Sequence, residues 1–255
     1  MAETILTFKP VVIAIVGGIL PALVWLWFWL KQDREAPEPT GLIALSFFAG
    51  MAIVYFVLPL QKLVLASISP IMDTANTLAF KFSLPPLNEQ TVQITLWAFI
   101  EEFAKYATVF LIAFKSNYFD EPMDAIIYLI TAALGFAAME NVLYILKDLA
   151  HGGAFEILAN GNMRFIGATI VHIVSSAFVG IAVAFSFYAP RHIKFITVIL
   201  GIFIASLLHA YFNLSIIESD GTMRTLLVFS QFWSAIIGII VLLAFVKRLP
   251  KPIDN

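Results

Sequence analysis

Three ionisable side chains lie inside the apolar run WAFIEEFAKYATVF, residues 97–110: Glu101, Glu102 and Lys105. On a helix, Lys105 is three or four residues from each acid, so its ammonium group can pair with either carboxylate. Two acids share one base, which leaves one carboxylate in excess. Because ionisable groups inside apolar segments are costly and usually mark a function, this run predicts a catalytic or transport centre.

Further polar residues interrupt three other apolar runs. They are Glu140 with Asn141 in GFAAMENVLYIL, His172 in GATIVHIVSSAFVG, and His209 with Asn213 in ASLLHAYFNLS. Counted from the ends of the runs at 1.5 Å per residue, the acids and imidazoles all lie about 9–15 Å below the same membrane face. We therefore expect a shared cavity in the outer half of the membrane.

These side chains provide the components for hydrolysis of a peptide bond. One acid of the pair can stay ionised beside Lys105, while the other acts as a general base for water. Glu140, His172 and His209 are ligand types that zinc accepts, with a position left for water. A route without metal is equally open, in which Asn213 donates a hydrogen bond to the developing oxyanion.

The composition places the chain in a membrane. Of its 255 residues, 61% are hydrophobic and 13% are charged, whereas typical soluble domains have roughly 45–50% and about 25%. The formal net charge of −2 gives no reason to expect nucleic acid as a partner. The absence of cysteine excludes thiol-protease chemistry. We expect an all-α, polytopic transmembrane helix bundle forming one integral membrane domain over residues 1–255, with the catalytic core at about 91–217.

The apolar runs predict seven or eight spans, since a crossing helix needs about 20 residues. The clear runs are 11–30, 41–61, 91–114, 123–146, 165–188, 194–217 and 225–246. The stretch 63–85 is interrupted by Pro70 and Asp73. It fits an eighth span, a re-entrant segment or an interfacial helix.

Basic residues orient the later spans, because cytoplasmic loops carry an excess of Lys and Arg. The residues on the side of the C-terminus are Lys115, Arg191, Lys194, Lys247, Arg248 and Lys251, and those on the other side are Lys147, Arg164 and Arg224. We therefore expect the C-terminal side to be cytoplasmic. The N-terminus then faces the cytoplasm with eight spans and the outside with seven.

The motifs together resemble the PrsW family of intramembrane proteases, relatives of the CAAX-prenyl endopeptidase and of bacteriocin-processing membrane proteins. The matching segments are EEFAK (101–105), DEPMDAIIY (120–128), GFAAMEN (135–141), His172 and HAYFN (209–213), within roughly residues 95–215. The joint match is specific, whereas a double Glu alone is not. Lys105 and Glu140 depart from the prenyl-endopeptidase branch, which has arginine further on and histidine in their places, so prenylated substrates are not expected.

The resemblance implies a peptidase in the bacterial cell membrane that cleaves a single-span membrane protein near the extracytoplasmic side. In the family's namesake role, the substrate is an anti-sigma factor cut at site 1. The resemblance makes Glu101 the base, and a divalent metal such as zinc a candidate cofactor. Carried over by position, the catalytic set is Glu101, Glu102, Lys105, Glu140 and Asn213, and the metal ligands are Glu140, His172 and His209.

A proton- or cation-coupled transporter is the alternative, because buried carboxylates, histidines and a lysine are also the parts of a proton relay. Transporters often contain two related halves with helices broken by Gly or Pro at matching positions. No such duplication is visible in the sequence, and the polar groups cluster near one face. The peptidase is therefore the preferred hypothesis.

Overall fold

The computed structural model describes residues 2–33, 36–150, 154–219 and 222–249, and within these ranges the chain forms eight α-helices and no strand. The helices are α1 (Ala2–Leu30), α2 (Thr40–Ala66), α3 (Ile68–Lys81), α4 (Glu89–Ile112), α5 (Pro122–Ala150), α6 (Ala154–Phe185), α7 (Arg191–Ile217) and α8 (Thr222–Val246). The predicted all-helical bundle is confirmed.

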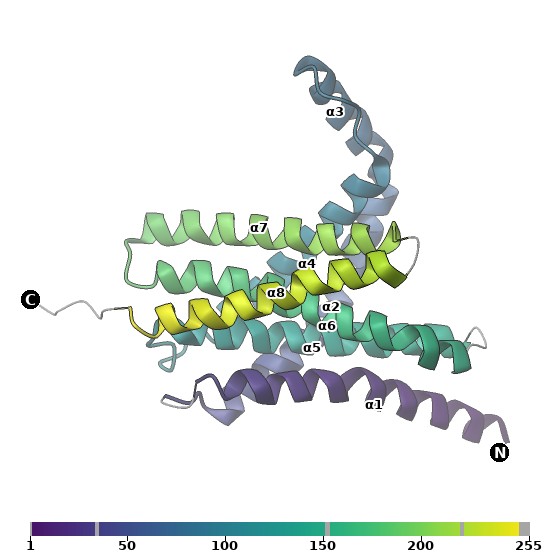
Figure 1. Ribbon diagram of the computed structural model, residues 1–255, viewed down its shortest axis with the longest axis horizontal. Coiled ribbons are helices and arrows are strands. Elements are labelled where there is room, and N and C mark those ends of the chain that lie inside the picture. Colours follow the sequence, from purple (N-terminus) through teal and green to yellow (C-terminus); the bar gives the residue numbers. More distant parts are fainter. Residues whose placement is uncertain (1, 34–35, 151–153, 220–221, 250–255) are drawn as a thin grey trace, which may run out of the picture.

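Helix α5 occupies the centre of the bundle (Figure 1). Helices α1, α2 and α6 pack against it, and α4 and α7 pack against α2 and α6 respectively, as well as against each other. The sequence of α5 is apolar on every side, and every residue from Pro122 to Ala138 is buried. A helix that is apolar all round is stable only when its neighbours cover it on all sides, as they do here.

Helices α2 and α5 cross in direct backbone contact at two glycines. A Cβ atom added at Gly50 would lie 2.1 Å from the carbonyl oxygen of Ala132, and one added at Gly135 would lie 1.9 Å from that of Phe47. Any side chain at either position would force the helices apart. Close packing of this kind between small residues is how membrane helices gain van der Waals contact.

Most helices of the bundle are able to cross a membrane. By length and composition, the candidate segments are Pro10–Leu30, Thr40–Ala66, Pro122–Leu149, Gly167–Phe185, Arg191–Ile217 and Met223–Val246. Helix α4 has 24 residues, long enough to cross, but its three buried charges lower its hydropathy. Because α4 packs inside the bundle against α2 and α7, we count it as the seventh crossing helix.

The ambiguous stretch 63–85 completes α2 and then forms α3. Helix α3 has 14 residues, too few to cross a membrane, and it projects sideways near the end of the bundle (Figure 1). Phe80 in α3 and Phe82 directly after it are exposed, as expected of the apolar face of a helix that lies at a membrane interface. Among the three alternatives, this arrangement favours the interfacial helix.

With α3 outside the count, α1 begins and α8 ends at opposite ends of the bundle (Figure 1). This arrangement fits the seven-span alternative, in which the N-terminus is outside and the C-terminus is cytoplasmic. Among the basic residues used for orientation, Lys251 lies outside the described residues.

Acidic side chains gather at the end of the bundle where α5 begins. One carboxylate oxygen from each of Asp33, Glu121 and Asp124 lies within 4.8 Å of the others, and Tyr128 donates a hydrogen bond to Glu38 nearby. Burial and the charges of Glu121 and Glu38 raise the pKa of Asp33 to about 6. The hydrogen bond from Tyr128 to Glu38 joins the segment before α2 to α5.

We expect Gly135→Ala to destabilise the protein, because the added methyl group meets the backbone of α2. Overpacking of this kind costs about 1–3 kcal/mol, and thermal unfolding in detergent measures it as a lower Tm. Gly238→Ala is the matched control, since a Cβ there meets nothing within 4 Å. Equal melting temperatures for the two variants would contradict the close contact.

Candidate active site

Helix α4 carries the double acid and turns it away from lipid. The helix begins at an Asn88 cap whose side chain accepts a hydrogen bond from the backbone N–H of Thr91 (3.1 Å). Glu101 and Glu102 are buried, whereas Phe99 and Phe103 on another face of α4 are exposed. The 3.6-residue repeat thus separates the acids from the lipid-facing aromatic rings.

Glu102 is bound on both carboxylate oxygens. Lys105 Nζ lies 2.5 Å from its Oε1, and His209 Nδ1 lies 2.8 Å from the same atom. The hydroxyl of Ser176 donates to Oε2 (3.3 Å). Because all these contacts favour the ionised form, Glu102 is suited to hold its neighbours in place rather than to exchange a proton.

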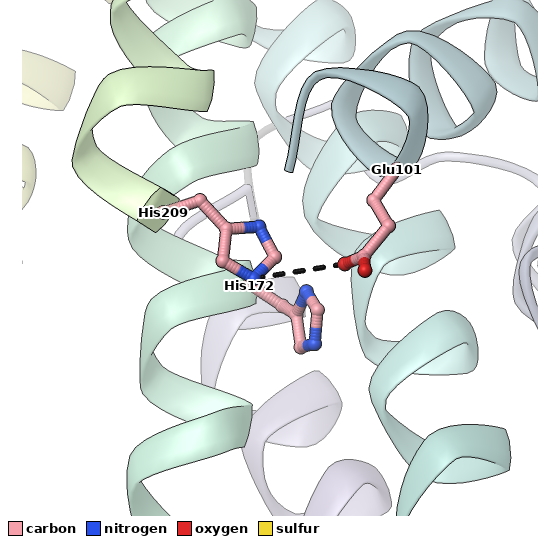
Figure 2. Close-up of side chains that lie close together, drawn as sticks. All are labelled: Glu101, His172 and His209. Atoms are coloured by element: carbon pink, nitrogen blue, oxygen red, sulfur yellow. Dashed lines mark ion pairs between the residues drawn. The ribbon is translucent and has the colours of Figure 1, made fainter. Parts of the chain in front are cut away.

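Glu101, in contrast, keeps one oxygen free. Its Oε1 accepts a hydrogen bond from Gln61 Nε2 (2.7 Å), while Oε2 is buried without a hydrogen-bond partner. That oxygen lies 3.6 Å from His209 Nε2, and Figure 2 shows Glu101 pointing toward both imidazoles. A buried carboxylate oxygen with no partner needs an explanation, and a ligand or a substrate water supplies one.

The two imidazoles meet edge to face, with ring centroids 4.9 Å apart. His209 Nδ1 faces the carboxylate of Glu102, and its Nε2 faces Glu101. His172 Nδ1 lies 3.1 Å from Lys105 Nζ. Because an ammonium group only donates, Nδ1 accepts, and the Nε2 proton is donated to Glu140 Oε2 (2.7 Å).

All the predicted site residues lie in or next to one cavity of about 330 Å³. Glu101, Glu140, His172, His209 and Asn213 line it directly, and Glu102 and Lys105 lie just behind the imidazoles. The predicted convergence of four helices on one cavity is thus what the structure contains. The roles of the individual residues remain predictions.

The donors around the cavity fit a divalent metal. One ligand atom from each of Glu101, His172 and His209 lies within 4.8 Å of the others, and two histidines with one glutamate form a common catalytic zinc set. The orphaned Oε2 of Glu101 and the hydrogen bond behind His209 fit this arrangement, since metal-bound histidines usually donate their second N–H to a carboxylate. Ligation by His172 through Nε2 would need its proton on Nδ1, the atom that the Lys105 ammonium group contacts, so His172 fits a metal less well than His209 does.

Glu101 is therefore a candidate ligand as well, and the set of Glu140, His172 and His209 remains a prediction. The side chain of Glu140 is 35% exposed at the cavity and contacts His172. Its neighbour Asn141 has a separate role, because it donates to Thr169 on α6 (3.4 Å).

Two residues of the site were missed from sequence. Gln61 on α2 holds Glu101, and its own carbonyl oxygen accepts from Trp97 Nε1 (3.1 Å). Phe229 on α8 lines the cavity. Gln61 could have been found as a polar residue that follows Pro59 in an apolar run. Phe229 could not, because nothing in the sequence distinguishes it from the many other apolar residues. Both lie outside the predicted core at about 91–217, whose bounds remain a prediction.

Comparison with known proteins agrees with this geometry. The sequence profile described as "PrsW family intramembrane metalloprotease" matches residues 38–246. The chain belongs to this family. A multi-pass membrane location follows from that membership together with the apolar helices, and the transporter alternative is not favoured.

Several curated bacterial relatives named "Protease PrsW" are similar to the chain. One from Geobacillus kaustophilus is 29% identical over 67% of this chain and 64% of its own length. Another from Halalkalibacterium halodurans is 25% identical over 77% and 80%, and one from Bacillus subtilis is 26% identical over 53% and 54%. The match thus spans less than two thirds of the Geobacillus and Bacillus subtilis relatives. No solved structure is significantly similar to the chain.

We expect the purified PrsW-family chain to bind one zinc ion, and removal of a donor to reduce the bound metal well below one per chain. His209→Ala and Glu101→Gln each remove one donor, and elemental analysis after dialysis measures the metal. His192→Ala is the control, because this exposed histidine at the start of α7 is not among the donors. Loss of metal in the control, or none bound to the unmodified protein, would contradict the site.

Proposed function

We propose that the protein hydrolyses a peptide bond of a membrane-protein substrate within the outer half of the bilayer. The observation that carries the proposal is the free Oε2 of Glu101, buried beside two imidazoles in a cavity. A carboxylate held in this way is a general base with a vacant position for water. Family membership supports the same reaction class.

In the proposed reaction, Glu101 takes a proton from the attacking water. The Gln61 amide holds Oε1, so Oε2 is the atom that receives the proton. The resulting hydroxide forms a bond to the carbonyl carbon of the substrate. Glu101 then returns the proton to the departing amine, so that one residue serves as base and acid in turn.

The developing oxyanion needs hydrogen-bond donors on the opposite side of the cavity. Asn213 lies one helical turn after His209 on α7 and lines the same cavity, so its amide is suited to donate to that oxygen. Glu102 and Lys105 act as positioning residues. They hold His209 and His172 through their ring nitrogens.

In the alternative route, Glu101, His172 and His209 would hold a metal, and a bound zinc ion would polarise a carbonyl group and make water more acidic. Oε2 of Glu101 would then be a ligand and would not also receive the proton from water. With or without a metal, Glu102 and Lys105 orient the imidazoles, and the surrounding helices keep lipid out of the cavity.

The cavity lies toward the end of the bundle where α7 ends and α8 begins (Figure 1). The excess of basic residues at the other end makes this the extracytoplasmic end. A single-span protein cut close to that face is the substrate that fits. An anti-sigma factor cut at site 1, as the family resemblance implies, is one such protein.

Replacing Glu101 by Gln tests the proposal directly. We expect the cleavage rate for single-span membrane proteins in detergent to fall by about 10²–10⁴, because the amide cannot accept the proton. Tm should stay close to that of the unmodified protein. Glu89→Gln, an exposed change on the same helix, should leave the rate unchanged. An unchanged rate in Glu101→Gln would remove this residue from the mechanism.

Gln61→Met keeps the length of the side chain and removes the donor to Glu101. We expect kcat to fall roughly tenfold, equal to about 1.4 kcal/mol of transition-state stabilisation. The reason is that the Glu101 carboxylate is then free to rotate. Gln231→Ala provides the comparison, since it removes an exposed hydrogen bond with Tyr211. If the two variants have equal kcat, Gln61 does not position the base.

A further inference from the structure

The catalytic cavity has two chemically different halves. One half holds the acids, the imidazoles and Asn213. The rest of the lining is apolar except for Thr225, and its apolar residues are Ala168, Val171, Phe212, Ile216, Ile217 and Phe229; we call these the apolar subsite. Hydrolysis requires only the first half, so the apolar subsite needs a separate explanation.

The apolar subsite lies on the outer side of the catalytic groups. Ala168 precedes His172 on α6 by one turn, about 6 Å, and Ile216 follows His209 on α7 by two turns, about 10 Å. Because α6 and α7 run in opposite directions (Figure 1), both displacements lead to the same end of the bundle. That end is the extracytoplasmic one.

The wall of the apolar subsite is held in a fixed shape. Phe212 and Phe229 are largely buried and pack edge to face, with centroids 5.9 Å apart. A Cβ atom added at Gly167 would lie 2.6 Å from the Phe229 ring, so the rings pack directly on the α6 backbone. Rings packed on both sides cannot easily move to fill the space. The subsite is therefore a formed hollow.

The size and charge of the cavity restrict what can enter. Its volume of about 330 Å³ gives room for one large side chain of an extended segment. An acidic side chain would meet the carboxylates of Glu101 and Glu140, which line the other half, and would lose its hydration among apolar groups.

From these observations we infer that the apolar subsite binds one large apolar side chain of the substrate, such as Leu or Phe. This side chain belongs to the residue beside the scissile bond on its extracytoplasmic side. The inference rests on the proposed peptidase function and adds a preference to it. Helix α8 supplies none of the proposed catalytic groups among the described residues. Its role is then to complete the specificity pocket through Phe229.

The experiment uses a single-span substrate with Leu, Phe, Ala, Trp or Asp placed in turn at each position flanking the cleaved bond. For the unmodified protein, kcat/KM should be at least about tenfold higher for Leu or Phe than for Ala at the extracytoplasmic position, because a few methylene groups in an apolar pocket are worth this much. Asp there should be cleaved more slowly than Ala. The position on the other side of the bond should show a weaker preference.

Two pocket variants move the preference in opposite directions. Ala168→Leu fills the subsite and should reduce the Leu-to-Ala ratio of kcat/KM about tenfold, whereas Ala168→Ser, similar in size to the original residue, should change it little. Phe229→Ala enlarges the subsite and should raise the Trp-to-Leu ratio about tenfold. Phe245→Ala, an exposed change on the same helix, should leave both ratios unchanged.

The outcomes separate the inference from the function on which it rests. If the unmodified protein cleaves substrates but the ratios do not change in the folded variants, the apolar subsite is refuted and the peptidase stands. If the unmodified protein cleaves no single-span substrate, both fall. Should Ala168→Leu fail to fold by its Tm, Phe229→Ala decides alone.

Discussion

The site depends on the contacts that the buried ammonium group of Lys105 makes. Its side chain has no exposed surface, and Nζ lies 2.5 Å from Glu102 and 3.1 Å from His172. An isolated carboxylate in an apolar bundle costs several kcal/mol, and a close partner with further hydrogen bonds offsets that cost. Lys105 thus lets Glu102 remain ionised and hold His209. The second acid, Glu101, is the one left with a free oxygen, so a single lysine separates the roles of two adjacent residues.

The bundle around this ion pair has to be tightly packed, because water at the pair would screen its charges and weaken it. Helix α5 provides the packing from the centre, with α2 in backbone contact at Gly50 and Gly135. The same crossing fixes α2, and α2 carries Gln61 to Glu101. Two glycines that do not line the cavity therefore help to fix the position of Glu101, the proposed general base.

The cavity combines chemistry and recognition in one hollow. Its polar half comes from α4, α5, α6 and α7, and α8 closes the apolar half. Both halves lie toward the end of the bundle where α7 ends and α8 begins, and α3 projects from the bundle near that end (Figure 1). A substrate that descends from that face would meet the apolar wall first and the base second. Recognition would then precede hydrolysis along the same path.

The sequence by itself determined the membrane class, the crossing helices and the polar residues at one depth, because hydropathy and helical spacing are local properties. The double acid, Lys105 and the two histidines are visible as exceptions in apolar runs. Only the tertiary structure decided which carboxylate keeps a free oxygen, that Glu101 rather than Glu140 lies with both imidazoles, and that α3 does not cross. Gln61 and Phe229 belong to the site for the same reason: their partners are distant in sequence, and no periodicity along one helix records which side chains meet across two.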